Sequence, residues 1–212
     1  MLQSFLVYSI TALLLFIFGS VAAKRERINN SIGKPTPFWT WEIAFSLLIF
    51  ALISGIRWQV GVDHLSYLRD YETLIRGHEL RAGRWEPGFY FISKLFANLN
   101  IHFVFYFAFW AFLQLFFIFY AHKNERYLLP FLGLVILLGP HYFSWMNGIR
   151  QMLAATIFVF SIQYIKDRKL IAYIITILLA ATIHKSAILL LIFYFIPQRD
   201  FFKNRYINIG LV

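Results

Sequence analysis

Long blocks of uncharged apolar residues constrain this sequence more than any other feature. Residues 4–23 form the first such block, with no charge in twenty positions. A helix needs roughly 20 apolar residues to cross a bilayer. Only 14% of the 212 residues are charged, against ~25% in an average soluble domain. The sequence therefore predicts an all-α, polytopic helical membrane protein.

About six membrane spans are expected from these blocks, within a single transmembrane domain covering residues 1–212. The blocks are residues 4–23, 38–56, 101–121, 127–142, 146–165 and 170–196. The last would be ~40 Å long as one helix, more than a ~30 Å hydrocarbon core, so we expect a break near His184. Residues 89–98 are too short to cross and contain Lys94, which favours an interfacial or re-entrant helix.

Basic residues predict the orientation of these spans. The loops after the first, third and fifth blocks contain Lys24, Arg25, Arg27, Lys34, Lys123, Arg126, Lys166, Arg168 and Lys169. Basic loops favour the cytoplasmic side, which places the N-terminus and residues 57–100 outside. The net charge of +10 is thus divided between two membrane faces, and this division argues against a nucleic-acid partner.

Three polar clusters then lie on the outward side, at residues 57–63, 147–151 and 184–186. Ionisable groups near membrane depth are usually functional. Arg57 and Arg150 carry the forked donors that suit phosphate oxygens, and together they could hold a pyrophosphate. The structural alternatives are an Arg150 that snorkels to the interface and a His184 that is hydrogen-bonded at a helix break.

Further candidates lie in the outward segment 57–100. Asp63, Tyr67 and Tyr71 are spaced by four and share one face if this stretch is helical. This face suits either sugar binding or packing on the bilayer surface. Glu86 precedes a Pro-Gly turn. The other outward cations are expected mainly to pair with loop carboxylates, which are Asp63, Asp70, Glu72, Glu79 and Glu86.

Several kinds of site are disfavoured by the sequence. There are no cysteines, which excludes disulfides, thiolate metal sites and thiol nucleophiles. The six histidines include no pair at three- or four-residue spacing, so no metal site is expected. There is no P-loop and no dinucleotide-binding glycine motif. We therefore expect no cofactor, and a lipid-linked phosphate suits the arginines better than a soluble nucleotide-activated donor.

The polar clusters carry a family resemblance. The stretches are residues 57–63 with Tyr67 and Tyr71, then Glu86-Pro87-Gly88-Phe89, residues 148–154 and residues 183–187. In this order and spacing, across residues 50–190, the sequence resembles the EpsG-like family of bacterial polysaccharide polymerases, which are related to the Wzy-type O-antigen polymerases.

The resemblance implies a multi-pass protein of the bacterial inner membrane. Its expected activity is to join undecaprenyl-diphosphate-linked repeat units into exopolysaccharide, capsule or O-antigen on the periplasmic or extracellular side. Other expected partners are the lipid bilayer and polysaccharide export or chain-length proteins. Members usually continue beyond six spans, and residues 206–212 resemble the start of another apolar segment. We therefore expect the chain to be the N-terminal portion of a longer polymerase.

Residue roles are hypotheses drawn from the chemistry of these side chains. His184 is the favoured general base, with Asp63 or Glu86 as alternatives. Substrate contacts are assigned to Arg57, Arg150, Gln151, Tyr67, Tyr71 and Ser186. Alternatives are a non-catalytic flippase or assembly partner for lipid-linked glycans, a metal-dependent glycosyltransferase using Asp63, and a membrane acyltransferase using His184.

Overall fold

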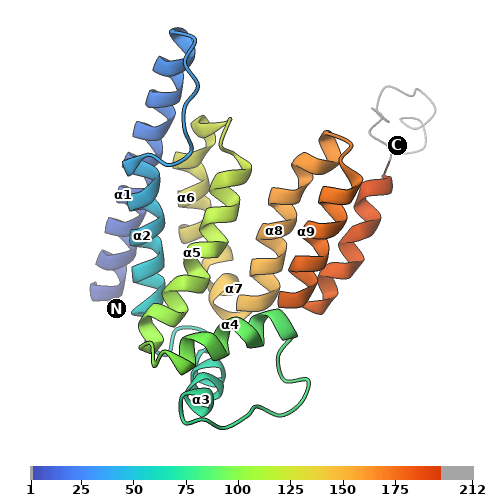
Figure 1. The fold of residues 1–212 in the computed structure, drawn as a ribbon. Helices are drawn as coiled ribbons and strands as arrows, with labels where there is room; N and C mark the ends of the chain where they lie inside the picture. Colours follow the sequence, from blue (N-terminus) through green and yellow to red (C-terminus); the bar gives the residue numbers. More distant parts are fainter. Residues whose placement is uncertain (1, 197–212) are drawn as a thin grey trace, which may run out of the picture.

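The computed structural model describes residues 2–196, and this part is helical without a strand (Figure 1). The α-helices are α1 (Leu2–Ser31), α2 (Trp41–Gly55), α3 (His64–Ile75), α4 (Pro87–Asn98), α5 (Phe103–Ala121), α6 (Leu129–Leu138), α7 (His141–Asn147), α8 (Ile149–Lys166) and α9 (Leu170–Ile183). Two 3₁₀ helices are η1 (Arg126–Leu128) and η2 (Lys185–Phe195). The all-α prediction is confirmed. The apolar segment expected at residues 206–212 lies outside the described residues.

The length and apolar character of the helices identify a helical membrane protein. Helix α1, over Phe5–Ser31, and helix α5 are long and apolar enough to cross a bilayer. Residues Arg126–Leu138 form a third candidate together with α7, although the two parts meet at a 65° bend. Helices α2, α9 and η2 are shorter apolar segments. By length and composition, two or three of the six expected spans are thus complete within residues 2–196.

Helix α5 lies between two packed groups of helices (Figure 1). One buried core joins α5 to α1, α2 and α6, and includes Leu15, Phe50, Leu115 and Leu129. The other joins α5 to α3, α4, α8 and α9, and includes Tyr71, Phe89, Trp110, Leu153 and Ala180. Both cores are made of large apolar and aromatic side chains, as expected from the apolar blocks of the sequence.

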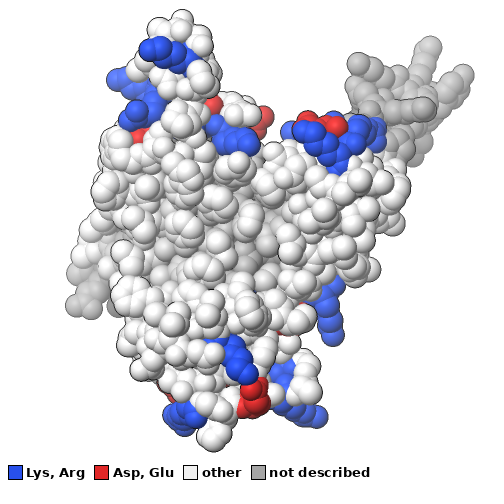
Figure 2. Space-filling model, in the orientation of Figure 1, with Lys and Arg blue, Asp and Glu red and all other residues white. Residues whose placement is uncertain are grey.

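The charged residues lie at the two ends of the bundle, with an uncharged band between them (Figure 2). Helix α1 begins at the end that carries α3 and α4 and finishes at the other end (Figure 1). The loops after α1, α5 and α8 all lie at that other end. The three basic loops therefore share one end, as the threading of the sequence predicted. Helix α4 runs across the base of the bundle and exposes apolar Phe91 and Leu95, as expected of an interfacial helix.

The last apolar block, residues 170–196, breaks near His184 as predicted, but its two parts form a hairpin instead of one span. Helix α9 ends at Ile183, where the extended backbone of His184 (φ −149°, ψ 114°) stops the helical hydrogen-bond ladder. Segment η2 then returns alongside α9 (Figure 1). The Tyr173 hydroxyl donates to the carbonyl of Leu190, 2.6 Å away, which a continuous helix could not allow. His184 therefore lies at a turn between two antiparallel segments.

The fourth and fifth blocks also divide differently from the prediction. Helix α6 stops at Leu138 because Pro140 cannot continue the ladder, and α7 follows after the bend. Met146, which was expected to begin the fifth span, belongs to α7. Helix α8 begins at Ile149, so Arg150 lies in its first turn as predicted.

Candidate functional site

Glu86 is the point where three distant parts of the chain meet. It immediately precedes α4, whose first residue is Pro87, and its side chain does not cap its own helix. One carboxylate oxygen, Oε2, forms an ion pair with Arg150 in α8. The other, Oε1, lies 3.2 Å from Nδ1 of His184 and 3.3 Å from the amide nitrogen of Lys185, which donates to it. Three of the polar motifs thus share one carboxylate.

A glycine allows this close approach. Gly88, in the first turn of α4, faces Thr182 in the last turn of α9. A Cβ at Gly88 would lie 2.8 Å from the Thr182 Cβ and 2.9 Å from its carbonyl oxygen. Such distances are shorter than real Cβ contacts, so a larger residue would push the two helices apart. The Pro-Gly pair therefore starts α4 and also brings Glu86 to the α9–η2 turn.

Arg150 is held on several sides but remains reachable. Its Nε donates to the Tyr67 hydroxyl at 3.4 Å, and its Nη1 donates to the carbonyl of Arg84 at 3.4 Å. The guanidinium carbon lies 5.8 Å from the centre of the Phe89 ring, within cation–π range. The side chain is 23% exposed, and Nη2 has no hydrogen-bond partner in the described part of the chain. A fixed guanidinium with a free donor suits an oxyanion ligand.

Gln114 holds the α7–α8 junction from which Arg150 projects. This buried α5 side chain donates from Nε2 to the carbonyls of Trp145 and Ile149, at 3.3 Å each. An amide from a neighbouring helix thereby satisfies carbonyls where the chain changes direction. The position of Arg150 thus depends on α5, which was predicted only as a membrane span.

The charge state of Glu86 follows from these contacts. Burial raises the pKa of its carboxyl, but the backbone hydrogen bonds from Lys185 and Glu86 and the charge of Arg150 outweigh burial. The net result is a pKa below the ordinary value for glutamate. At neutral pH, Glu86 is therefore an ionised acceptor facing both Arg150 and the His184 ring.

A small polar cavity of about 120 Å³ lies beside Arg150. It is lined by Asp63, Ser66, Tyr67, Asp70, Arg84, Trp85 and Arg150. Arg84 is fixed within it, because Nε pairs with Asp70 at 2.7 Å and Nη2 donates to the Ser66 hydroxyl at 2.6 Å. Asp63 makes no ion pair in the described part of the chain. Carboxylates, a hydroxyl and aromatic rings are thus gathered around one space.

Ser66 and Trp85 were not among the predicted site residues. A signal for Ser66 existed, because positions 63, 66, 67 and 70 follow the helical spacing that grouped Asp63 with Tyr67. Trp85 directly precedes Glu86, but its burial against Phe89 appears only in the folded chain. Pairing between outward cations and loop carboxylates was expected without specific partners, and three such pairs form: Arg84–Asp70, Arg76–Glu72 and Lys94–Glu79. Glu86, in contrast, pairs with Arg150.

Tyr71, Gln151 and Ser186 lie outside this cluster of contacts. The Tyr71 ring is fully buried and stacks on Tyr106, and its hydroxyl donates to the carbonyl of Ile101 at 2.7 Å. Burial raises the pKa of Tyr71 to about 12. Gln151 and Ser186 are exposed beside Arg150 and Lys185, without side-chain hydrogen bonds among residues 2–196. Their predicted substrate contacts stay predictions.

Arg57 has a different set of partners from Arg150. The residue is 5% exposed, and its guanidinium donates to the carbonyls of Ser54 at 3.0 Å and Met146 at 3.3 Å. These carbonyls belong to the C-terminal ends of α2 and α7, which carry partial negative charge. The ring of Phe107 lies 5.0 Å from the guanidinium carbon. Among the described residues, the two arginines therefore share no hydrogen-bond partner.

Metal-ligating side chains are not clustered in the described residues. Within residues 2–196, no group of three or more histidine, aspartate or glutamate side chains is arranged to hold an ion.

The fold and the site define a helical membrane protein with an arginine–glutamate–histidine cluster at one end of its bundle. A family model named EpsG family matches residues 40–211, which include every site residue described above. The chain belongs to the EpsG family, a group associated with polysaccharide polymerase-like membrane proteins. A search of curated proteins and a search of solved structures each found no match.

Proposed function

We propose that this chain is a polysaccharide polymerase that joins glycan repeat units carried on undecaprenyl diphosphate. The observation that carries the proposal is the convergence of Arg150 and His184 on Glu86. An anion-binding side chain and a proton acceptor are thereby placed around one carboxylate. We further propose that the site faces the periplasmic or extracellular side of the bacterial inner membrane, since the basic loops lie at the opposite end.

Arg150 is the proposed contact for the departing diphosphate. Negative charge develops on the bridging oxygen as the bond from the anomeric carbon breaks, and a preorganised donor stabilises that charge. The free Nη2 and the 23% exposed side chain leave Arg150 able to bind an oxyanion while Glu86 fixes its orientation. In this proposal Arg57 supports the fold behind the site and does not touch substrate.

His184 is the proposed general base. Its Nδ1 faces Glu86, which leaves Nε2 for the acceptor hydroxyl. The hydroxyl proton passes to Nε2 while the oxygen forms a bond to the anomeric carbon, and the electron pair of the broken bond leaves with the diphosphate. Glu86 stabilises the imidazolium that results, in the way a carboxylate assists histidine in acyl-transfer sites. Asp63 remains the alternative base, because its carboxylate is unpaired at the cavity.

The cavity beside Arg150 is the proposed binding site for the sugar ring next to the scissile bond. Tyr67 and Trp85 offer aromatic faces, and Asp63 and Ser66 offer hydrogen-bonding groups for hydroxyls. A volume of about 120 Å³ accommodates one ring and not an oligosaccharide. The cavity thus fits a single sugar beside the reacting carbon.

A comparison of two histidine variants tests this proposal. His184→Gln in the full protein should reduce polymer formation by about 10²–10⁴-fold, the usual contribution of a general base. His122→Gln is the matched control, because His122 caps α5 at the opposite end of the bundle. Polymer length and amount are measured in cells at equal membrane levels of each variant, together with the lipid-linked single repeat units that should accumulate.

Two outcomes would contradict the proposal. Normal polymer in His184→Gln would remove its role as base. A purified protein that moves lipid-linked glycan across vesicles without forming a new glycosidic bond would identify a translocating or assembly function, and transfer of a labelled acyl group would identify an acyltransferase.

A further inference from the structure

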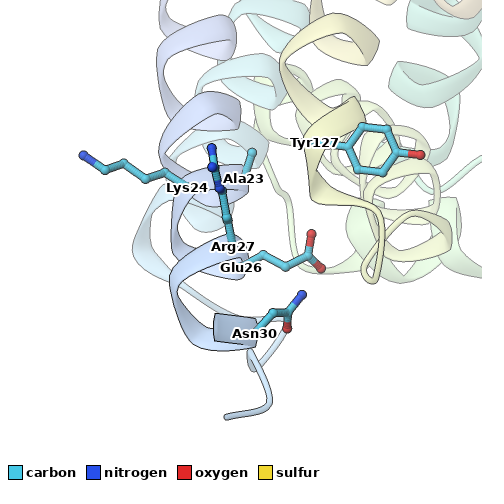
Figure 3. A pocket seen from close by; sticks show the side chains of 6 residues that line it. All are labelled: Ala23, Lys24, Glu26, Arg27, Asn30 and Tyr127. Atoms are coloured by element: carbon cyan, nitrogen blue, oxygen red, sulfur yellow. The ribbon is translucent and has the colours of Figure 1, made fainter. Parts of the chain in front are cut away.

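A second cavity lies at the end of the bundle opposite to Glu86. It has a volume of about 570 Å³ and is lined by Ala23, Lys24, Glu26, Arg27, Asn30 and Tyr127 (Figure 3). The lining comes from the final turns of α1 and from η1. This cavity belongs to neither the cluster around Glu86 nor the space beside Arg150.

The position of the cavity matches the headgroup region of a bilayer. The uncharged run of α1 ends at Ala23, and the helix continues to Ser31 as a polar extension. At 1.5 Å per residue, this extension is ~12 Å long. The polar layer on each side of a ~30 Å hydrocarbon core is roughly 5–8 Å thick. Lys24 and Arg27 lie within the first ~6 Å of the extension, so they are at the level of lipid phosphates. Figure 3 shows the Arg27 side chain extending along the helix towards Ala23.

The charges around the cavity favour an anionic ligand. Lys24 and Arg27 form no ion pair in the described part of the chain. The carboxylate of Glu26 is already engaged, because it accepts the backbone N–H of Arg126 at 2.9 Å. Arg25, on the same turn of helix, is paired with Glu42 at 2.6 Å. Two cations are therefore left unpaired beside one engaged carboxylate, and Asn30 and Tyr127 add neutral donors.

The surface below the cavity is apolar and accessible. Phe16 lies on the same helical stripe as Ala23 and Arg27, and Phe131 lies one turn after Tyr127. Their rings pack edge to face with centroids 6.2 Å apart, and they are 37% and 59% exposed. A ligand with a phosphate in the cavity and hydrocarbon chains on this stripe would match both parts of the surface.

We propose that this cavity binds the phosphodiester headgroup of an anionic phospholipid, with the acyl chains lying along Phe16 and Phe131. Lys24 and Arg27 contact the phosphate oxygens, and the hydroxyl of Tyr127 and the amide of Asn30 donate to the headgroup. The lipid occupies the gap between the end of α1 and η1 and joins these segments. This inference does not depend on the proposed polymerase reaction.

Retention of phosphatidylglycerol by the purified full chain tests this site. Native mass spectrometry would count lipid bound to the wild type and to the double variant Lys24→Gln/Arg27→Gln. The matched control is Lys34→Gln/Lys123→Gln, which removes the same charge at the same end from outside the cavity. Each cation in the site should contribute about fivefold to retention, so the cavity variant should lose most of the lipid while the control keeps it.

Additional variants and ligands distinguish lipid binding in this cavity from a general effect of positive charge. The variant Lys24→Arg/Arg27→Lys should fold and retain phosphatidylglycerol, which guards against a double variant that is merely misfolded. Equal lipid loss in the cavity and control variants would overturn the proposal, as would equally strong retention of phosphatidylcholine. Displacement of the lipid by an equal concentration of inorganic phosphate would also overturn it, because the acyl chains would then contribute nothing.

Discussion

Arg57 and Arg150 show how one residue type with one predicted role can occupy two different environments. Arg57 is 5% exposed and donates to carbonyls at the ends of α2 and α7. The side chain of Arg150 is 23% exposed, pairs with Glu86 and borders a polar cavity. The two Nη atoms of Arg57 donate to backbone carbonyls, and its unpaired Nε is buried. Arg150 keeps a donor for a ligand.

The counter-charges explain this difference. At Arg57, positive charge is balanced by the partial negative charge of two helix C-termini, and no described carboxylate is paired with it. At Arg150, a full negative charge on Glu86 fixes the guanidinium and is itself shared with the α9–η2 turn. A guanidinium buried on backbone carbonyls stabilises the fold. A partly exposed one held by a carboxylate beside a cavity can also bind an anion.

Among the variants that test the contrast between the two arginines, the largest effect is expected from Arg150→Ala. Removing a preorganised donor to the leaving diphosphate should lower polymer formation by about 10²–10³-fold. Arg150→Lys should recover only part of it, because lysine lacks the planar fork. Polymer is quantified against the membrane level of each variant, and single repeat units on lipid are measured in parallel. Polymer of normal length and amount in Arg150→Ala would show that the two arginines do not differ in function.

Gly88→Ala should have the next largest effect. The added Cβ would meet Thr182 at 2.8 Å, so α4 must move away from α9 and carry Glu86 with it. A misplacement of about 1 Å can cost about 10²-fold in rate, and a loss of this order is expected in polymer formation. Gly148→Ala is the control, since its Cβ would make only ordinary contacts of 3.6 Å and longer. Equal activity of the two variants would contradict a role for the close approach.

Arg57→Met should separate stability from activity. It leaves the carbonyls of Ser54 and Met146 without their donor, which should lower the free energy of unfolding by about 3 kcal/mol. Polymer formed per folded molecule should fall far less than in Arg150→Ala. Thermal unfolding in detergent and polymer yield per folded protein are the two measurements. If the variant unfolds like the wild type but makes no polymer, Arg57 contacts the substrate, as the sequence predicted, and does not mainly stabilise the fold.

The comparison also shows what the sequence could predict. The apolar blocks, the shared end of the basic loops and the helix that contains Arg150 follow from hydropathy, charge and spacing along the chain. Those signals are local, and each concerns one segment at a time. Arg150 and His184 were predicted as ionisable groups near membrane depth and Glu86 as a carboxylate before a Pro-Gly turn, and the family motifs include all three. The contacts among them appear only in the folded chain.

Hydropathy, charge and spacing did not predict the contacts between segments. The return of η2 along α9 depends on the backbone at His184, and an apolar stretch looks the same whether it crosses once or folds back. The burial of Arg57 depends on α7, which is 89 residues away at Met146. The partner of Glu86 was expected in its own loop, whereas the fold supplies Arg150 from α8. Each of these outcomes is set by packing between elements.

The surroundings of Arg57 predict a smaller, pH-dependent effect at His64. This buried ring lies 4.9 Å from the ring of Phe107, and neither ring nitrogen has a hydrogen-bond partner within the described residues. Burial and, secondarily, the charge of Arg57 lower the pKa of His64 to about 4. The unfolded chain therefore binds a proton at higher pH than the folded chain does, near the ordinary value of ~6.5. Stability should be complete above that pH and decline as the pH falls towards 4.

His64→Phe should remove this decline, because phenylalanine fills the apolar site and does not titrate. The linkage amounts to at most about 1.4 kcal/mol per pH unit, so the wild type should lose up to about 2 kcal/mol between pH 6.5 and pH 5 that the variant keeps. Apparent melting temperatures of both proteins, measured from pH 7.5 to pH 5, give the comparison. If the two profiles run parallel, His64 is not protonated on unfolding in this range. The surroundings of Arg57 would then be open to water, which would weaken the contrast between the two arginines.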